Sequence, residues 1–392
     1  MAKAHTAEVA VVGGGASGLI AAIALAQASA ETNLFAPPAG ADRRTTALLD
    51  GSVRILEALG VWSALAPQAA PLARLRIVDG TRRLIRAPEV TFDARELDLD
   101  AFGYNIENDI LQRALRAEAA RHPALRLIES AVNSVSPDDD AVVLKARGCE
   151  ERVQLVIGAD GRNSFCRRAA GIETRRREFP QVALTMNLRH SRPHENTSTE
   201  FHTETGPFTL VPLPGDRSSL VWVADLREAR ALNATDDAAL ALEVERRVHS
   251  ILGRMEIDGA RGSFPLSIET ADRLANKRIV LVGEAGHLLP PIGAQGLNLG
   301  IRDAATIAEI VADARRVGED VGGAGVLNAY EERRRSDVRS RALAVEWMNR
   351  SLLTDFLPVH AARGFGLELA SRFGFLRRAL MREGLGPSGE RL

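Results

Sequence analysis

The sequence predicts an α/β fold: a discontinuous nucleotide-binding domain, an inserted and mostly antiparallel β-sheet domain, and a helical C-terminal region. Short valine-rich runs that lead into glycine turns occur near the start, the middle and the later third of the chain. Stretches of alternating polar and apolar residues lie between them, which indicates separate antiparallel strands. The chain beyond Leu327 has a mostly helical pattern.

The first unit of the predicted fold is a strand, a turn and a helix. Val9–Val12 is a short apolar run of the kind found in buried parallel strands. Ala16–Ala28 is rich in alanine, leucine and isoleucine and predicts a buried helix, and Thr32–Ala36 predicts the second strand. The uncharged stretch from Val9 to Ala30 also suits a signal peptide or a membrane span. The triplet Gly13–Gly15 interrupts it, however, so we favour strand, glycine turn and buried helix.

The next elements alternate between the two predicted domains. Helical patterns occupy Ser52–Leu65 and Asn108–Arg121, and alternating stretches between Leu72 and Phe92 indicate strands of a separate sheet. Leu125–Leu144 predicts paired strands around a turn at Ser136–Asp139. The later elements are buried strands at Val153–Ile157 and Arg278–Val282, further strands from Val182 to Val223, and helices at Ala238–Leu252, Leu297–Ala314 and from Leu327 onward.

These elements give the expected domain boundaries. Segments 1–72, 101–178 and 264–325 form the nucleotide-binding domain, and segments 73–100 and 179–263 form the inserted sheet domain. The C-terminal helical region covers 326–392.

Composition narrows the function classes. The 392 residues carry a net charge of −1, so no global charge indicates a nucleic-acid partner. Cys149 and Cys166 show no metal-ligand spacing, no metal site is expected, and both thiols fit a reduced, cytoplasmic protein. Arginines outnumber acidic residues from Arg333 to the end. That excess fits either a solvated helical surface or a face that contacts an anionic membrane or an acidic partner.

A glycine motif follows the first strand directly. Gly13, Gly15 and Gly18 have the spacing that allows a tight turn, close approach of the backbone to a pyrophosphate, and close packing of helix on strand. The helix N-terminus then presents unpaired N–H groups to the phosphates, as in Rossmann-like domains. The acidic residue that commonly ends the second strand and binds a ribose is missing, because Ala36 stands there. Asp42 is a candidate to replace it.

Two further motifs follow later strands. Gly158–Ser164 has the sequence GADGRNS, and Gly283–His287 has the sequence GEAGH. A loop rich in glycine and proline, Pro290–Gly300, comes next and leads into a helix. Small residues there let backbone approach a flat ring, and the helix start would place positive potential beside it. A plain glycine cap on a core helix is the alternative interpretation of this loop.

In this order and spacing, the three motifs resemble those of flavoprotein aromatic hydroxylases with the para-hydroxybenzoate hydroxylase fold. The similarity is greatest to the hydroxylases of ubiquinone biosynthesis, and it extends over nearly the whole chain. Further segments that match this branch are Arg44–Leu48, Gly103–Asn108, Gly206–Leu213, Ser263–Leu266, Arg302–Ala304, Arg363–Gly366 and Met381–Gly386.

The resemblance implies FAD as the cofactor. Gly13, Gly15 and Gly18 would hold its pyrophosphate, and Arg44 would reach it from the loop after the second strand. The remaining cofactor-binding residues implied are Asp160, Gly161, Gly283, Glu284, Gly296, Leu297 and Asn298, and the flavin-facing loop would include Pro291, Gly293, Gln295 and Gly296. The family has aspartate where this chain has Glu284, and His287 is interpreted as structural.

The implied reaction is hydroxylation of a phenolic ring by a flavin-dependent monooxygenase, on a polyprenylated precursor of ubiquinone. NAD(P)H or a partner reductase would supply electrons. Phe201, Phe208, Leu210 and Trp222 are candidates for the substrate pocket, or else plain core residues. The implied location is cytoplasmic or peripheral on the inner membrane, and membership of a biosynthetic complex is a further expectation. Membrane contact would use an apolar, arginine-rich segment that includes Trp347, Leu352, Phe356, Phe365, Phe373 and Phe375. The alternative, which we favour, is that this segment is a helical lid packed on the flavin domain.

Four alternatives stay open at this point. A flavin halogenase lacks its tryptophan motif here, and a flavin-dependent reductase of prenyl chains matches the later loop and the C-terminus less well. A flavin-dependent hydroxylase of another aromatic metabolite is a further alternative. The most distinct alternative is a catalytically silent scaffold with an FAD fold, which Ala36 and Glu284 keep open. Flavin occupancy separates this scaffold from the enzymes.

Overall fold

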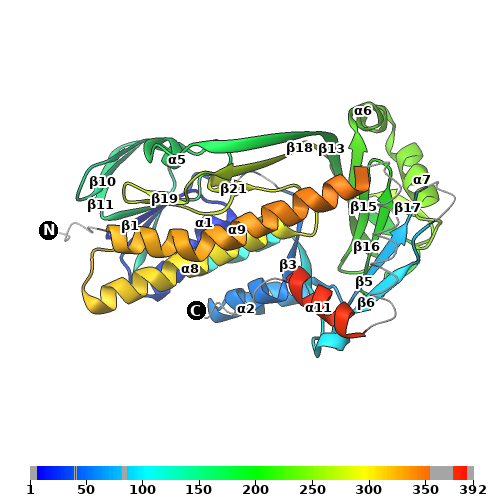
Figure 1. Cartoon of the computed structure of the whole chain (residues 1–392), viewed down its shortest axis with the longest axis horizontal. Helices are drawn as coiled ribbons and strands as arrows, with labels where there is room; N and C mark the ends of the chain where they lie inside the picture. The colour runs from blue at the N-terminus through cyan, green and yellow to red at the C-terminus, as the bar shows by residue number, and fades with distance from the viewer. Residues whose placement is uncertain (1–6, 39, 41, 82–85, 354–373, 386–392) are drawn as a thin grey trace.

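A parallel sheet forms the centre of one half of the molecule (Figure 1). The computed structural model describes residues 7–38, 40, 42–81, 86–353 and 374–385. The strand order is β19-β20-β12-β1-β2-β8, and all neighbours are parallel except β19 and β20. The strands are β1 (Val9–Val12), β2 (Thr32–Phe35), β8 (Leu125–Ile128), β12 (Leu155–Gly158), β19 (Ala275–Asn276) and β20 (Ile279–Leu281).

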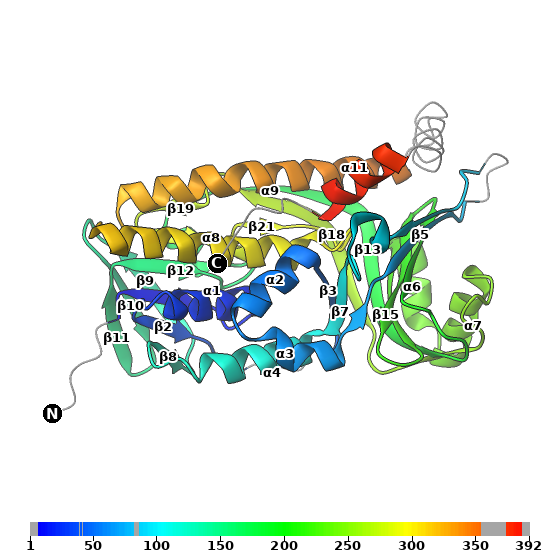
Figure 2. The ribbon, with the colours of Figure 1, turned by 90° about the horizontal axis from the view of Figure 1, so that it is seen from below.

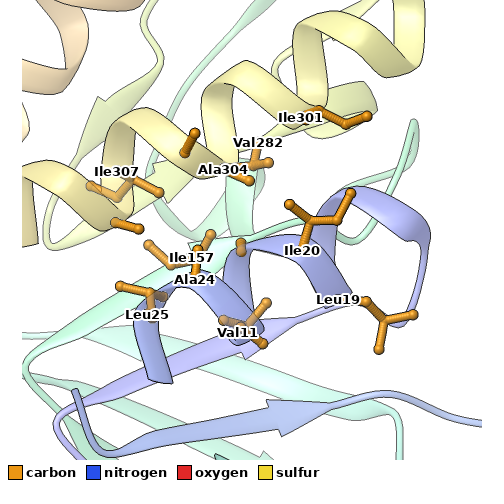
Figure 3. Close-up of a cluster of buried hydrophobic side chains, with 14 of the residues drawn as sticks. Val11, Leu19, Ile20, Ala24, Leu25, Ile157, Val282, Ile301, Ala304 and Ile307 are labelled. Atoms are coloured by element: carbon orange, nitrogen blue, oxygen red, sulfur yellow. The ribbon is translucent and has the colours of Figure 1, made fainter. Parts of the chain in front are cut away.

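Helices cover one face of this sheet. Helix α1 (Ala16–Gln27) packs between the sheet and α8 (Gln295–Val317), and α9 (Ala324–Leu353) lies along α8. Figure 3 shows the contact, in which side chains from β1, α1, β12 and α8 meet. Helix α1 is apolar on most sides because both of its faces are buried. The same half contains α2 (Asp50–Ala58), α3 (Trp62–Leu65), η1 (Ala66–Gln68), α4 (Asn108–Ala119), α5 (Phe165–Ala169) and η3 (Gly283–Ala285).

Two small sheets complete this half. One contains β9 (Val132–Pro137), β10 (Val142–Ala146) and β11 (Cys149–Val153), and its apolar residues share a core with β1 and β12. The other contains β3 (Thr45–Leu49), β4 (Ala70–Pro71) and β7 (Gly103–Glu107).

A larger, mostly antiparallel sheet forms the other half. Its order is β21-β18-β13-β16-β15-β14-β5-β6, with β17 on β13, and only β14 and β5 pair in parallel. Strands β13 and β18 are long and extend from one half of the molecule into the other (Figures 1 and 2). The bounds are β5 (Arg74–Asp79), β6 (Val90–Asp93), β13 (Thr174–His190), β14 (Thr197–Thr203), β15 (Gly206–Leu213), β16 (Arg217–Asp225), β17 (Met255–Ile257), β18 (Gly262–Ala271) and β21 (His287–Leu288).

Helices α6 (Leu226–Ala234) and α7 (Asp237–Arg247) cover the outer face of the large sheet. Helix α11 (Gly374–Leu385) lies at its β5–β6 edge, where Met381 packs with Val90 and Phe92, and η2 (Ala94–Leu97) follows β6. Within the described residues, no helix has the length and apolar character needed to cross a membrane.

The predicted α/β fold, with its antiparallel sheet and C-terminal helices, is confirmed. Two local predictions differ from the structure in part. The paired strands predicted within Leu125–Leu144 are present as the β9–β10 hairpin, but Leu125–Ile128 lies outside this hairpin, because it pairs in parallel with β2 at the sheet edge. The helix predicted over Ser52–Leu65 is split into α2 and α3, since Gly60 adopts φ +74° between them.

The expected domain boundaries stay a prediction. Strands β13 and β18 cross the positions 178/179 and 263/264, so each strand belongs to both halves. The apolar segment that includes Phe356, Phe365 and Phe373, and the motif Arg363–Gly366, lie outside the described residues.

Candidate functional site

The glycine turn between β1 and α1 is fixed by two close backbone contacts. Gly13 adopts φ +124°, and a Cβ there would lie 2.1 Å from the carbonyl oxygen of Ala159. A Cβ at Gly18 would lie 2.1 Å from the carbonyl oxygen of Gly13. Only glycine fits both positions, because real Cβ contacts are never this short. The turn therefore brings the start of α1 against the loop that follows β12.

Gly15 differs from these two glycines. It is the N-cap of α1 with ordinary extended angles, φ −72° and ψ 171°, and no side chain caps the helix. No heavy atom lies within 4 Å of where its Cβ would be. The first N–H groups of α1 thus face open space, as an anion site at a helix N-terminus requires.

Helix α4 supports the glycine turn from the side. Gln112 donates a hydrogen bond from Nε2 to the carbonyl oxygen of Gly14 at 2.8 Å, and Arg116 donates to that of Pro37 at 2.9 Å. Ala36, where an acid was expected, is fully buried. The sequence did not indicate Gln112 or Arg116, because the helical pattern shows only which face of α4 is apolar.

Arg44 lies in a loop held by acidic and amide groups. Its guanidinium makes a two-pronged contact with Asp42, at 2.8 and 2.7 Å, and Asn108 donates to the same carboxylate at 2.9 Å. Burial alone would raise the pKa of Asp42, but the hydrogen bonds from Arg44 and Asn108 outweigh it and lower that pKa. Arg44 also lies over the ring of Phe264, 5.4 Å from its centroid, and so joins this loop to β18.

Asp160 makes local contacts. Its carboxylate accepts hydrogen bonds from the hydroxyl of Ser164 at 2.5 Å and from the backbone N–H groups of Phe165 and Cys166 at 2.6 and 3.1 Å. It therefore stabilises the start of α5. Gly161 adopts φ +75° with open space beside it, so this loop exposes backbone rather than a side chain.

The Gly283 turn rests on a buried ion network. Asp303 accepts a hydrogen bond from the N–H of Gly283 at 3.0 Å, and Nε2 of His287 lies 2.6 Å from the same oxygen. Arg334 on α9 donates to the other oxygen at 2.8 Å, and all three side chains are at most 1% exposed. Burial alone would raise the pKa of Asp303, but His287 and Arg334 outweigh it and lower that pKa strongly. His287 is thus a buried structural residue. The sequence indicated the segment Arg302–Ala304 but gave no role to Asp303, and it did not indicate Arg334.

Glu284 has a different environment from this network. It is exposed, and its carboxylate is close enough to raise the pKa of Arg44, although Asp42 has the larger effect. The Arg44 loop and the Gly283 turn therefore approach the same region from two sides.

The loop before α8 is held by Asn298. Its side-chain oxygen accepts from the N–H of Leu49 at 2.9 Å, and its amide donates to the carbonyl oxygens of Ala47 and Ala294 at 2.8 and 2.6 Å. The side chain of Asn298 is therefore fully used in joining β3 to the loop. The amide of Gln295 donates to the carbonyl oxygen of Gly293 at 2.9 Å.

The sequence-predicted segments converge. Ser17 in α1 lies beside both Gly283 and Gly300, where a Cβ would come within 3.0 and 2.4 Å of its hydroxyl oxygen. The glycine turn, the Gly283 turn and the start of α8 therefore meet around one helix turn. Gly296 faces open space in the first turn of α8, and Pro291 is exposed in the preceding loop. Leu297 is half-buried beside the core.

The large sheet turns one face toward this region, which we call the inner face. Ser219 on β16 accepts a hydrogen bond there from Asn105 of β7, and Val221 and Val223 follow on the same side. The partly exposed residues Thr185, Thr209, Val211 and Val221 lie on this face in the central strands β13, β15 and β16. Partial exposure in central strands means that the inner face is not fully packed against the other half.

The four pocket candidates do not lie on the inner face. Phe201, Phe208, Leu210 and Trp222 are at most 4% exposed and pack with Leu232, Leu240 and Val244 of α6 and α7. They are core residues on the outer side of the sheet. Two shallow surface hollows, of about 450 and 340 Å³, lie around Leu242 and Arg278 and are away from the converging segments.

Comparison with known proteins identifies the family. The family model described as an FAD binding domain matches residues 6–344. The chain belongs to this family of FAD-dependent aromatic hydroxylases. The family establishes FAD as the cofactor and confirms the resemblance to flavoprotein aromatic hydroxylases that the three motifs indicated. No group of residues suited to hold a metal ion occurs in the described part of the chain.

Relatives match over almost the whole length. Ubiquinone hydroxylase UbiL of Rhodospirillum rubrum is 33% identical over 97% of this chain and 90% of the relative. The 3-demethoxyubiquinol 3-hydroxylase of Escherichia coli is 32% identical over 97% of this chain and 98% of the relative. The crystal structure of p-nitrophenol 4-monooxygenase PnpA from Pseudomonas putida covers 99% of both chains with a TM-score of 0.80. At 19% identity, that likeness concerns the fold.

Proposed function

We propose that this chain is an FAD-dependent monooxygenase that hydroxylates the phenolic ring of a polyprenylated precursor in ubiquinone biosynthesis. The observation that carries the proposal is the uncapped, unobstructed N-terminus of α1 at Gly15, together with relatives that are named ubiquinone hydroxylases. Gly13 and Gly18 set the turn, and the N–H groups after Gly15 would bind the pyrophosphate. This arrangement fits the cofactor that the family requires.

The other cofactor contacts follow from the same geometry. Arg44 and the exposed Glu284 border the region on two sides. The backbone of Gly161 and Gly283 and the first turn of α8, from Gln295 to Asn298, would face the flavin. The side chains of Asp160 and Asn298 would act through the backbone that they hold, since their hydrogen bonds are already made.

Bound FAD supplies the redox chemistry and oxygen activation, and the protein supplies position and exclusion of water. The N-terminus of α8 would stabilise negative charge on the reduced ring. The loop that contains Pro291 and Gly293 would form one wall, and the inner face would hold the phenol opposite it. Electrons would come from NAD(P)H or from a partner reductase, the donor that the motifs leave open.

We also propose contact with a membrane surface, because a polyprenylated substrate partitions into lipid. Trp347 at the end of α9 and Phe375 on α11 are 70% and 71% exposed, and Leu380 is 50% exposed. Arg378 and Arg382 lie on α11 with Phe375 and Leu380. Exposed aromatic residues with arginines are typical of helices that lie in the membrane interface. The protein would therefore be cytoplasmic and peripheral on the inner membrane, within a biosynthetic complex.

A single-turnover assay tests the reaction without knowledge of the donor. The FAD-loaded protein is reduced with dithionite, mixed with oxygenated buffer and ortho-prenylphenol, and the products are analysed by mass spectrometry. We expect a dihydroxylated ring that carries one oxygen atom from labelled O₂. Complete reoxidation of the flavin with no hydroxylated product from this or longer prenylphenols would contradict the proposal.

A silent scaffold is the second candidate, which the buried Ala36 and the exposed Glu284 favour. Both positions weaken the expected cofactor contacts. A folded protein that takes up no FAD would support this scaffold over the enzyme.

A further inference from the structure

Glu200 and His202 form a hydrogen-bonded pair on β14. Nε2 of His202 lies 2.9 Å from Oε1 of Glu200, and the two side chains are 17% and 11% exposed. Residues two apart in a strand share a face, so both point to the same side of the sheet. With its proton on Nε2, His202 donates to Oε1 and leaves Oε2 as an acceptor.

The pair belongs to the inner face. The hydroxyl of Thr209 lies 3.4 Å from Oε2 of Glu200, and Thr209 is the cross-strand neighbour of Val221. Val221 is in turn opposite Thr185 on β13. Glu200, Thr209, Val221 and Thr185 thus form one row across four strands, and all four are partly exposed.

This row leads toward the converging segments. Thr185 pairs with Gly262 on β18, and the ring of Phe264 lies beside it. Phe264 contacts Arg44, the residue expected to reach the cofactor. Because neighbouring strands are about 4.8 Å apart, Glu200 lies roughly 14 Å from Thr185 along the row. A phenol with its ring over Val221 and Thr209 would have its hydroxyl beside Glu200.

The row has one carboxylate and otherwise only hydroxyl and apolar groups. The outer side of the same strands is a closed core. Phe201, which lies between Glu200 and His202 in the sequence, and its cross-strand neighbour Phe208 both pack in that core. At the far end, Ile77 pairs with Val90 and packs in the cluster that contains Met381 of α11. Glu200 is therefore the ionisable group at the apolar end of the row.

We propose that Glu200, oriented by His202, is the proton acceptor for the phenolic hydroxyl of the substrate. The inference rests on the proposed hydroxylase function and deepens it. The phenol O–H would donate to Oε2 of Glu200, which raises the electron density of the ring. A carboxylate in this position selects a free phenol over a ring whose oxygen is alkylated.

The proton balance of the step is complete. A ring carbon forms its bond to one oxygen atom of O₂ as the O–O bond breaks, and the second oxygen would leave as water on the two electrons that the reduced cofactor supplies. In the same step the phenol O–H bond breaks and its proton moves to Oε2. The electron pair of that bond forms a ring ketone. When the attacked carbon then loses its hydrogen as a proton to water, Glu200 returns its proton to the ketone oxygen, and the aromatic diol results. A positioned base of this kind contributes about 10²- to 10⁴-fold.

The test uses the FAD-loaded full chain in the single-turnover assay. The variant is Glu200→Gln, which keeps the size of the side chain and removes the base. The matched control is Glu204→Gln, an exposed position on the turn of the same hairpin. We expect Glu200→Gln to lower the hydroxylation rate at saturating ortho-prenylphenol by about 100-fold and to weaken its binding by about 10-fold, and Glu204→Gln to match the wild type.

The acidity of the phenol distinguishes a role of Glu200 as a base from a purely structural role of the Glu200–His202 pair. The phenol of a ring-fluorinated ortho-prenylphenol is more acidic, so its deprotonation depends less on a base. The ratio of the wild-type rate to the Glu200→Gln rate should therefore be smaller for the fluorinated phenol. A ratio that is the same for both phenols would overturn the proposal, because a purely structural defect lowers both rates equally.

A binding measurement on the wild type covers the case in which Glu200→Gln fails to fold. The wild type should bind ortho-prenylphenol about 10-fold or more tightly than its methyl ether, with a red shift in the phenol absorption band. Equal affinity and no shift would overturn the role of Glu200 while leaving hydroxylation intact. Absence of hydroxylation by the wild type would instead contradict the proposed function.

Discussion

Replacement of Gly15 by valine separates cofactor binding from folding. The N-cap backbone is already extended and no heavy atom lies within 4 Å of the new Cβ, so the apoprotein should lose about 1 kcal/mol or less. The valine side chain would instead fill the space in front of the first N–H groups of α1. If it removes two hydrogen bonds to a charged phosphate, at about 1.5 kcal/mol or more each, the Kd for FAD rises roughly 150-fold.

The assay is thermal unfolding with and without FAD. At a concentration about 100 times the wild-type Kd, FAD stabilises the wild type by about 2.7 kcal/mol. With an unfolding entropy of about 2.1 cal/mol/K per residue over 392 residues, that amounts to roughly 3 °C in Tm. The variant at the same FAD concentration should gain less than about 1 °C.

Two control variants distinguish a loss of FAD binding from a loss of stability. Gly384→Val fills open space at a helical glycine on α11 and should keep the full FAD response. Gly18→Ala introduces a Cβ only 2.1 Å from a carbonyl oxygen and should lower the Tm of the apoprotein itself. A Gly15→Val protein that keeps an FAD shift of the wild-type size would refute the assignment of the pyrophosphate site.

Three further predictions concern other residues. Glu284→Asp should keep or improve FAD affinity in a fluorescence titration, and a loss of more than about 10-fold would mean that the turn is adapted to glutamate. Asp303→Asn removes the carboxylate shared by buried His287 and Arg334 and leaves Arg334 paired with Asp337, so it should cost about 3 kcal/mol, or roughly 4 °C in Tm. The pKa of Asp303 is lowered in the folded protein, so its carboxylate stabilises the fold at pH values above the usual aspartate pKa of about 3.9. This stabilisation is lost as the pH falls below that value. The free energy of unfolding, measured below about pH 4, should therefore decline less steeply with falling pH in Asp303→Asn than in the wild type. Trp347→Ala should reduce sedimentation with anionic vesicles at least several-fold and leave FAD affinity unchanged, and equal sedimentation would remove the membrane contact from α9.

Local patterns predicted the parts of the fold that depend on near neighbours in sequence. The run Val9–Val12, the glycine turn and α1 follow from residues within one short segment. Leu125–Ile128 was misplaced because its partner is β2, which is far away in sequence, and a four-residue apolar run does not specify which strand it joins.

The same distinction applies to the site. Glycine spacing indicated the turn at Gly13, but the contacts of Gln112, Asn298 and Asp303 join segments distant in the sequence. The inner face was also beyond sequence reasoning. The strands β13, β15 and β16 carry apolar residues on both sides, and α6 and α7 cover one of these sides. The sequence therefore lacks the alternation of polar and apolar residues that would distinguish the core side from the pocket side.

The visible absorption spectrum of the purified protein, before and after incubation with excess FAD and removal of unbound cofactor, tests the central claim most directly. We predict a flavin spectrum retained at about one FAD per chain, and its loss in Gly15→Val. A folded wild-type protein that retains no flavin after this treatment would contradict the enzyme assignment and favour the scaffold.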